Sequence, residues 1–375
     1  MDRAEKKRKI TRYKSGIQIT MVIYIIFGLL LGVLNGAMSN VLEAQTQYII
    51  HLLYQLYEHE GRVLTVLLCS IFTVRLLKIS KGEISRFRKI TLVSLNMFMI
   101  VLHLIIPYIL GFRGIYIIFM PFPWSTSILQ VWETGGIFST SYEERFGAYA
   151  FLVASSFYLV YQLIVLVGTL LLGRRWHCTL ICTMNACHAE TAGEALPMRT
   201  LNEKRPKSKA ISQKGRKGFL IFQGAMFLFN IGLIVLWVLY ITLSLEIIPI
   251  ETLQTMELLK YLLLELIFMC IFWLIIGGRG YCYYCPAGTM LGFISKASGQ
   301  QITTGLTQCT QCGLCNDACK MSLDIMSYAE KGVPMRNMNC VGCNLCVEAC
   351  PHGNLEYTTK FLTKLRLYKQ NHRAQ

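Results

Sequence analysis

Long apolar segments constrain this chain more than any other feature of its sequence. A transmembrane helix needs about 20 apolar residues to cross the roughly 30 Å hydrocarbon core of a bilayer. Six segments approach or exceed that length, covering residues 17–38, 63–79, 90–111, 148–172, 218–245 and 257–277. In lipid, only a helix or a closed barrel satisfies its own backbone hydrogen bonds, and runs of this kind predict helices. The sequence therefore predicts an all-α, polytopic membrane domain with six transmembrane helices.

The distribution of charge supports this prediction. Only 15% of the residues are charged, against about 25% in a typical soluble domain. Lys and Arg are concentrated at 1–16, 80–89 and 173–217, and the intervening segments 39–61, 112–147 and 246–256 hold few or none. Basic loops stay on the cytoplasmic side, so the alternation predicts a protein of the cytoplasmic (inner) membrane with both termini in the cytoplasm. The net charge of +16 is thereby explained without nucleic acid as a partner.

Two cysteine runs in the C-terminal part of the chain have the same spacing. Each reads Cys-x2-Cys-x2-Cys-x3-Cys, and the second follows the first by 31 residues and ends in Cys-Pro. This is the run of bacterial two-cluster ferredoxins, in which the fourth cysteine binds the other cluster. Zinc is the alternative, but structural zinc sites use two cysteine or histidine pairs.

The ferredoxin pattern predicts two [4Fe–4S] clusters with exchanged fourth ligands. The first cysteine set is Cys309, Cys312, Cys315 and Cys350. The second cysteine set is Cys340, Cys343, Cys346 and Cys319. We therefore expect a small α+β, ferredoxin-like domain over residues 300–358, on the cytoplasmic side. It would follow a basic tail (1–16) and the membrane unit (17–290), and precede a second basic tail (359–375).

Two further cysteine elements directly follow the fourth and sixth apolar segments, at 173–190 and 278–288. Each contains Gly-Arg, then an aromatic residue and a pair of cysteines, and both are predicted at the inner membrane surface. Their cysteines are Cys178, Cys182, Cys187, Cys282 and Cys285. Thiolates from both elements can meet as a third metal site or act as a redox-active dithiol, and they can also be structural thiols. The sequence leaves these three readings open.

From about Leu170 onward, these motifs resemble a family of membrane polyferredoxin-type proteins. Its members include the quinol-dehydrogenase-like subunits of periplasmic nitrate and nitrous-oxide reduction and the accessory ferredoxins of copper oxidases. The family's juxtamembrane elements usually read Cys-x3-Cys-Pro. Here Thr183 replaces the proline of the first, Cys187 is additional, and the second has one residue fewer between its cysteines. The resemblance implies quinol as a donor and a reductase as a partner.

Two ionisable residues interrupt the apolar segments away from their ends. Such residues are costly in a bilayer and are functional candidates, so His103 and Glu265 are predicted to exchange protons with a quinol. The alternatives are a histidine bonded to a helix carbonyl and a carboxylate paired with a neighbouring helix.

The predicted function is electron transfer between a membrane redox pool, or a cytoplasmic donor, and a partner reductase or ferredoxin. The chain would be a subunit of an oxidoreductase system rather than a stand-alone enzyme, with membrane lipid and the quinone pool as further partners. The sequence does not fix the direction of electron flow. The alternative function is an assembly or metal-handling protein that reduces a metal ion such as copper for another enzyme.

Overall fold

The structure is a computed structural model of the whole chain. It describes residues 2–36, 43–109, 120–124, 140–196, 213–243, 247–275, 279–305 and 309–371. Most of these residues are helical, and a small domain with a two-stranded sheet lies at the C-terminal end. Much of the predicted outer loop 112–147 and of the basic segment 197–212 lies outside the described residues.

Six helical runs correspond to the six apolar segments. They are α1 (Arg3–Gly36), α2–η1–α3 (Ala44–Leu56, Tyr57–Gly61, Arg62–Lys81), α4–η2–α5 (Arg86–Ile100, Val101–Ile105, Ile106–Ile109), α7 (Thr140–Leu172), α10 (Gln213–Leu243) and α11–η5–α12 (Ile250–Leu259, Lys260–Ile267, Phe268–Ile275). The first five contain a stretch long and apolar enough to cross a membrane. The sixth carries Glu257, Lys260 and Glu265, which lowers its apolar character.

The second run differs from the sequence prediction at its start. Residues 39–61 were predicted as an outer loop, but the chain is helical from Ala44 through to Lys81. Glu58 and Glu60 break the apolar pattern that the prediction depended on. In the fold, the buried Glu58 carboxylate forms an ion pair with Arg62 one turn later, which allows a charged turn to stay helical inside the protein.

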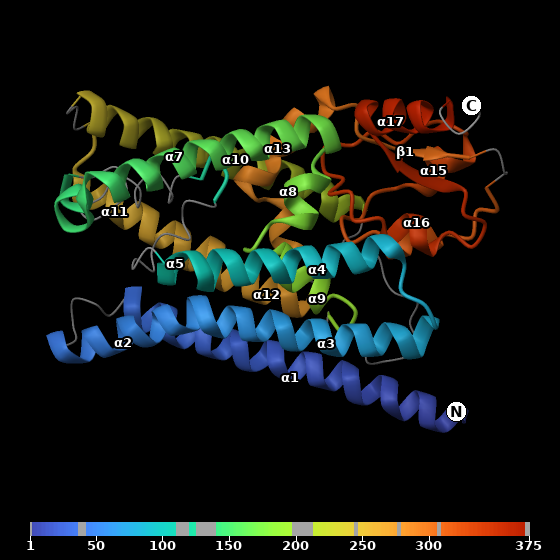
Figure 1. Cartoon of the computed structure of the whole chain (residues 1–375), viewed down its shortest axis with the longest axis horizontal. Helices are drawn as coiled ribbons and strands as arrows, with labels where there is room; N and C mark the ends of the chain where they lie inside the picture. Colours follow the sequence, from blue (N-terminus) through green and yellow to red (C-terminus); the bar gives the residue numbers. More distant parts are fainter. Residues whose placement is uncertain are drawn as a thin grey trace.

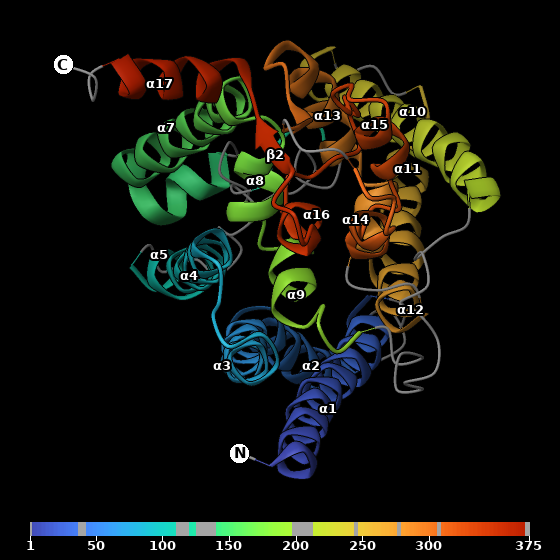
Figure 2. The same ribbon diagram turned by 90° about the vertical axis from the view of Figure 1, so that its right-hand side faces the viewer.

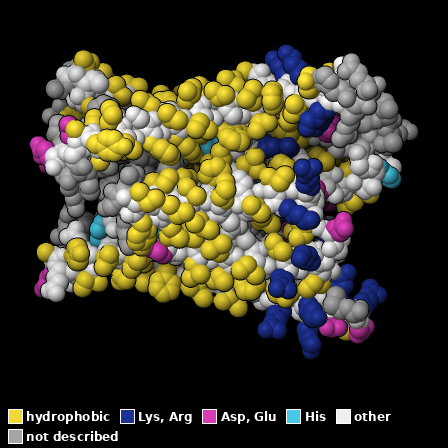
Figure 3. Space-filling model, viewed as in Figure 1, with side chains coloured by type: hydrophobic (Ala, Val, Ile, Leu, Met, Phe, Trp, Pro, Cys, Tyr) yellow, Lys and Arg dark blue, Asp and Glu magenta, His cyan; other side chains and the backbone are white. Residues whose placement is uncertain are grey.

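Apolar side chains and basic side chains gather at different places along the bundle. Figure 1 shows the long helices running side by side, with the start of α1 and α17 (Lys360–Asn371) both at the end that carries the C-terminal domain. On the face drawn in Figure 3, apolar side chains cover the middle of the bundle, and Lys and Arg gather near that same end. This arrangement is typical of a membrane protein with a basic side.

The C-terminal domain contains two copies of one small unit, a cysteine run that includes a short helix. Strand β1 (Gln301–Thr304) pairs antiparallel with β2 (Leu355–Thr358), with Gln301 opposite Thr358. Between the strands lie α14 (Leu314–Ala318), α15 (Met326–Glu330) and α16 (Leu345–Ala349). Helices α14 and α16 each carry the third cysteine of a run. The short sheet closes the repeat into one domain, as the predicted α+β class requires.

The two juxtamembrane elements are more deeply buried than predicted. The first forms α8 (Arg175–Leu180) and α9 (Ala186–Thr191), and the second forms η6 (Gly280–Tyr283) and leads into α13 (Pro286–Ala297). Viewed from the C-terminal domain, α9 lies among the long helices (Figure 2). It contacts α3 and α4, and Thr73 on α3 donates to the Thr191 carbonyl. These elements therefore fill the end of the bundle that faces the C-terminal domain.

Candidate iron–sulfur sites and membrane cavity

Each predicted cysteine set lines its own cavity in the C-terminal domain. All four cysteines of the first set line one cavity, together with Met326, His352 and Leu355. All four cysteines of the second set line another, together with Ile302, Met321 and Val341. The fourth cysteine of each run thus lies with the three leading cysteines of the other run. This grouping is the exchanged arrangement of two-cluster ferredoxins.

The repeat produces these cavities through its backbone. Helices α14 and α16 begin after residues with left-handed backbone angles, Gly313 and Asn344. Gly342 also has a positive φ, and a side chain there would come within 2.8 Å of Arg175 and 2.9 Å of Tyr357. Glycine is the residue that permits such a turn at such close approach. The chain can therefore bend its cysteines around one centre.

The chemistry of the two sets fits [4Fe–4S] clusters. Both consist of sulfur donors, which suit soft metal centres. Burial raises the pKa of Cys343 to about 11 and that of Cys319 to about 12. Cluster ligation by the eight cysteines stays a prediction, and the cavities are compatible with it.

The juxtamembrane elements are joined by two reciprocal arginine contacts. Arg174 of the first element donates to the Cys282 carbonyl of the second at 3.4 Å. Arg279 of the second donates to the Cys178 carbonyl of the first at 2.6 Å. Both guanidinium groups are buried. The Gly-Arg motif shared by the two elements therefore holds their cysteine pairs against each other.

Four of the five juxtamembrane cysteines form one group. The Arg174 guanidinium donates to the Cys178 sulfur at 3.3 Å and to the Cys282 carbonyl at 3.4 Å. Cys182 follows Cys178 by four residues, and Cys285 follows Cys282 by three. We call these four cysteines the juxtamembrane thiol set. The fifth, Cys187, donates to the Thr183 carbonyl at 2.9 Å and packs with residues of α3 and α4 in an apolar cluster that Cys182 also borders.

His103 and Glu265 contact different groups. Both are buried, and the ring of His103 faces the ring of His59 at 5.6 Å between centroids. Glu265 accepts a hydrogen bond from Trp124 at 2.7 Å and has the Lys260 ammonium at 3.6 Å. His59 facing His103 was missed in the sequence, where it lies in the segment predicted as a loop.

These ionisable residues lie on three π-helical turns. Turn η1 carries Glu58 and His59, η2 carries His103, and η5 carries Lys260 and Glu265. Single π-helical turns inside α-helices are rare and occur often at functional sites. Helical periodicity in the sequence gives no signal for them.

A small cavity inside the bundle borders two of these turns, through Glu58 and Glu265. It is lined by Tyr24, Tyr57, Glu58, Arg62, Met120, Met184, His188, Tyr261, Glu265, Leu266, Met269, Cys270 and Trp273. His188 stacks against Trp273 at 4.7 Å, and no hydrogen-bond partner for either of its ring nitrogens is found among the described residues. Trp273 donates to Asn185 at 2.5 Å, and Asn185 donates to the Cys282 sulfur at 3.2 Å.

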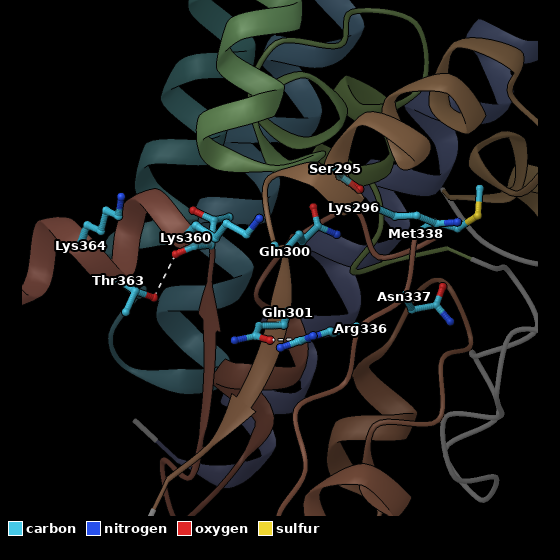
Figure 4. Close-up of a pocket in the computed structure, with 12 residues that line it drawn as sticks. Ser295, Lys296, Gln300, Gln301, Arg336, Asn337, Met338, Lys360, Thr363 and Lys364 are labelled. Carbon is cyan, nitrogen blue, oxygen red and sulfur yellow. Dashed lines mark hydrogen bonds between the residues drawn. The ribbon is translucent and has the colours of Figure 1, made fainter.

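Two larger openings lie elsewhere. A groove of about 600 Å³ between the C-terminal domain and α17 is lined by basic side chains, including Lys296, Arg336, Lys360 and Lys364 (Figure 4). It suits an anionic group. A groove of about 670 Å³ between α3 and α4 is almost entirely apolar, with Asn96 bonded to Ser70 at 2.7 Å.

Comparison with known proteins supports the iron–sulfur assignment of the C-terminal domain. Residues 308–355 match the family described as a 4Fe-4S dicluster domain. Over 69 residues the chain is 33% identical to YccM of Escherichia coli (strain K12), which is described as a candidate electron transport protein. That match covers 18% of this chain and 18% of the relative. No solved structure gives a significant match. The chain therefore carries a ferredoxin-type 4Fe-4S domain.

Proposed function

We propose that this protein is a membrane-bound electron-transfer subunit that relays electrons between the quinol pool and a redox partner on the cytoplasmic side. One observation carries the proposal. Groups with redox or proton chemistry follow one another from the bundle cavity, through the juxtamembrane thiol set, to the second and then the first cysteine set. When bound, the [4Fe–4S] clusters supply one-electron transfer without bond making.

The membrane end of this path offers proton acceptors. Oxidation of a quinol to a quinone releases two electrons and two protons. Glu265 and the Glu58–Arg62 pair line the cavity, whose volume of about 30 Å³ admits water. We assign these side chains to proton transfer rather than to binding of the quinol ring. The groove between α3 and α4 provides an apolar surface of suitable size for a lipid-soluble ring.

The experiment is cluster reduction by a quinol. Anaerobically purified, full-length protein in lipid nanodiscs would be mixed with a reduced quinol, and EPR would follow the cluster signals. We expect reduction in the wild type and at least tenfold slower reduction in Glu265→Gln. Glu251→Gln, at an exposed position on the same helical run, is the matched control. A quinol that leaves the clusters oxidised, combined with a quinone that leaves reduced clusters unchanged, would refute the proposal.

We further propose six spans with both termini in the cytoplasm. The basic side chains that gather beside the C-terminal domain support this orientation, as does the start of α1 at the same end. Reporter fusions after Gln375 and within residues 112–147 are expected to show opposite sidedness. A C-terminal fusion on the outer side would contradict the orientation.

Metal handling is the second candidate function, because the same cavity is rich in soft ligands. Met184, Met269, Cys270 and His188 all line it, and thioether, thiolate and imidazole groups suit Cu(I). A protein of this kind would pass one electron to Cu(II) and hold the Cu(I) formed. Competition with a Cu(I) chelator separates the two functions. Stoichiometric Cu(I) retention that is lost in Met184→Leu would favour metal handling over the quinol relay.

A further inference from the structure

The juxtamembrane thiol set lies between the membrane cavity and the second cysteine set. On the membrane side, Asn185 connects Trp273 to the Cys282 sulfur by two hydrogen bonds. On the other side, the backbone of Arg174 donates to Gln300 at 2.7 Å, and Gln300 donates to the Cys340 carbonyl at 2.7 Å. A redox centre held by this set would therefore have a short hydrogen-bonded path for electrons to Trp273 at the cavity and another to Cys340 of the second cysteine set.

The buried charge at this point requires an anion. The Arg174 side chain is 1% exposed, and the contacts seen for its guanidinium are the Cys178 sulfur at 3.3 Å and two backbone carbonyls. Among the described residues, no carboxylate forms an ion pair with it. A buried cation without a charged partner is costly, and neutral thiols would leave it uncompensated.

The nearby buried carboxylate of Glu190 is paired with other arginines and not with Arg174. Glu190 forms ion pairs with both Arg279 and Arg88, so it already serves two cations. Glu194 also approaches Arg88, at 3.6 Å. The thiol set can supply this negative charge as thiolates, because the Cys178 sulfur lies 3.3 Å from the Arg174 guanidinium.

Hydrogen bonds to sulfur point to ligated thiolates rather than free thiols. The Cys282 sulfur accepts from Asn185 at 3.2 Å and has Arg279 at 3.7 Å, and the Cys178 sulfur accepts from Arg174. The Cys285 sulfur accepts from the Gly288 backbone at 3.3 Å. Such donors stabilise the charged sulfurs of iron–sulfur clusters and adjust their potential.

Four cysteine donors from two elements match the ligand number of one [4Fe–4S] cluster. Among the described residues, no three His, Cys, Asp or Glu side chains lie close enough to share one metal ion. The same is true of the two ferredoxin sets, although each lines a cavity. A cubane binds its four thiolates through four different iron atoms, and its ligands therefore stand farther apart than those of one zinc ion.

We infer that Cys178, Cys182, Cys282 and Cys285 hold a third [4Fe–4S] cluster, placed between the membrane cavity and the cluster of the second cysteine set. Held by these four thiolates, such a cluster would supply one-electron transfer, accepting an electron from one neighbour and passing it to the next. The inference rests on the proposed electron-relay function for its role, but the presence of the cluster can be measured without any quinol.

Metal analysis of full-length protein purified anaerobically tests the inference directly. We expect about twelve iron and about twelve sulfide per chain, four of each for every cluster, and Mössbauer spectra that account for three cubanes. About eight of each in a fully loaded preparation would overturn it. This measurement needs no variant, so it does not depend on how a mutation affects folding.

Variants then locate the third cluster. Cys282→Ser and Cys285→Ser should each lower the iron content by about four and leave the EPR signals of the other two clusters unchanged, which also shows that the protein is folded. Cys187→Ser is the matched control, because Cys187 belongs to the first element but its thiol donates to the Thr183 carbonyl, and it should keep all the iron. Equal iron in Cys282→Ser and the wild type would overturn the inference.

The outcomes for the cluster and for the relay can be told apart. Twelve iron atoms without reduction by quinol would leave the third cluster in place and refute the proposed donor. Eight iron atoms with rapid reduction by quinol would refute the third cluster and leave the relay in place.

Discussion

The two cysteine sets of the C-terminal domain have the same spacing but different surroundings. In the first set, Cys312 is exposed and Cys309 is partly exposed. In the second set, Cys346 is buried, and the neighbouring loop is covered by Arg175, which donates to the Gly342 carbonyl at 2.8 Å and lies 3.5 Å above the Tyr357 ring. The two sets share one sequence repeat, so the repeat does not explain this difference. It arises because the C-terminal domain packs against the helical domain on the side of the second set.

Charge increases this difference. Burial raises the pKa of Cys340, while Arg175, Arg174 and Arg279 act in the opposite direction. All three arginines come from the juxtamembrane elements. A cluster in the second set would thus lie beside fixed positive charge, and one in the first set would lie near solvent. Exposure and nearby charge both set cluster potentials, so clusters in the two sets would have different potentials.

The largest expected effect is the loss of one whole cluster through the exchanged ligand. Cys319→Ser should remove the cluster of the second set, because Cys319 lines that cavity, and lower the iron content by about four. Cys350→Ser should do the same to the first set. EPR of each variant is the measurement, with Cys69→Ala, at a buried cysteine of α3, as control. Damage confined to the first set in Cys319→Ser would contradict the exchanged arrangement.

The next effect concerns the docking of the second set. Glu190→Gln leaves Arg88 and Arg279 without their shared buried carboxylate, and breaking such a pair costs about 3–5 kcal/mol. The midpoint of denaturant-induced loss of cluster absorbance should fall accordingly. The control is Glu356→Gln, which breaks the exposed pair with Arg366 and should cost at most about 1 kcal/mol. Equal losses in the two variants would show that the buried network does not hold the domain in place.

The difference in solvent exposure predicts a smaller effect, a difference in the rate at which the two sets lose iron. A water-soluble iron chelator should remove iron from the first set several-fold faster than from the second, because Cys312 is exposed whereas Cys343, at the equivalent position of the second run, is only partly exposed. The EPR signals that remain at successive times identify the cluster that is lost first. Loss of both clusters at one rate would remove the distinction drawn between the sets.

The smallest effect is a shift in potential. Burial lowers the pKa of Arg175 to about 10, so the side chain is still charged at pH 7 and favours the reduced, more negative cluster. Arg175→Gln should lower the potential of the second-set cluster by about 40 mV, equivalent to about 1 kcal/mol. Arg336→Gln, at an exposed position, should leave it unchanged. Redox titration by EPR compares the two, and an equal shift in both would contradict a local effect of Arg175.

The sequence by itself determined that the chain has two parts, a set of long apolar helices and a C-terminal ferredoxin-type domain. Apolar length predicted long helices because lipid offers the backbone no other partner. Cysteine spacing predicted a ferredoxin-type domain because three of the four ligands to each cluster come from one short run. Both signals are local, and they could be recognised without knowing how distant segments meet.

Tertiary structure alone decided which residues surround the candidate sites. The Glu190 carboxylate is 89 residues from Arg279, Asn185 is 97 residues from Cys282, and no local pattern relates them. The loop prediction at 39–61 failed because Glu58 is compensated inside the fold by Arg62. Whether a buried charge is tolerated depends on the partner it meets, and for Arg174 that partner is set by the packing of two elements from separate helices.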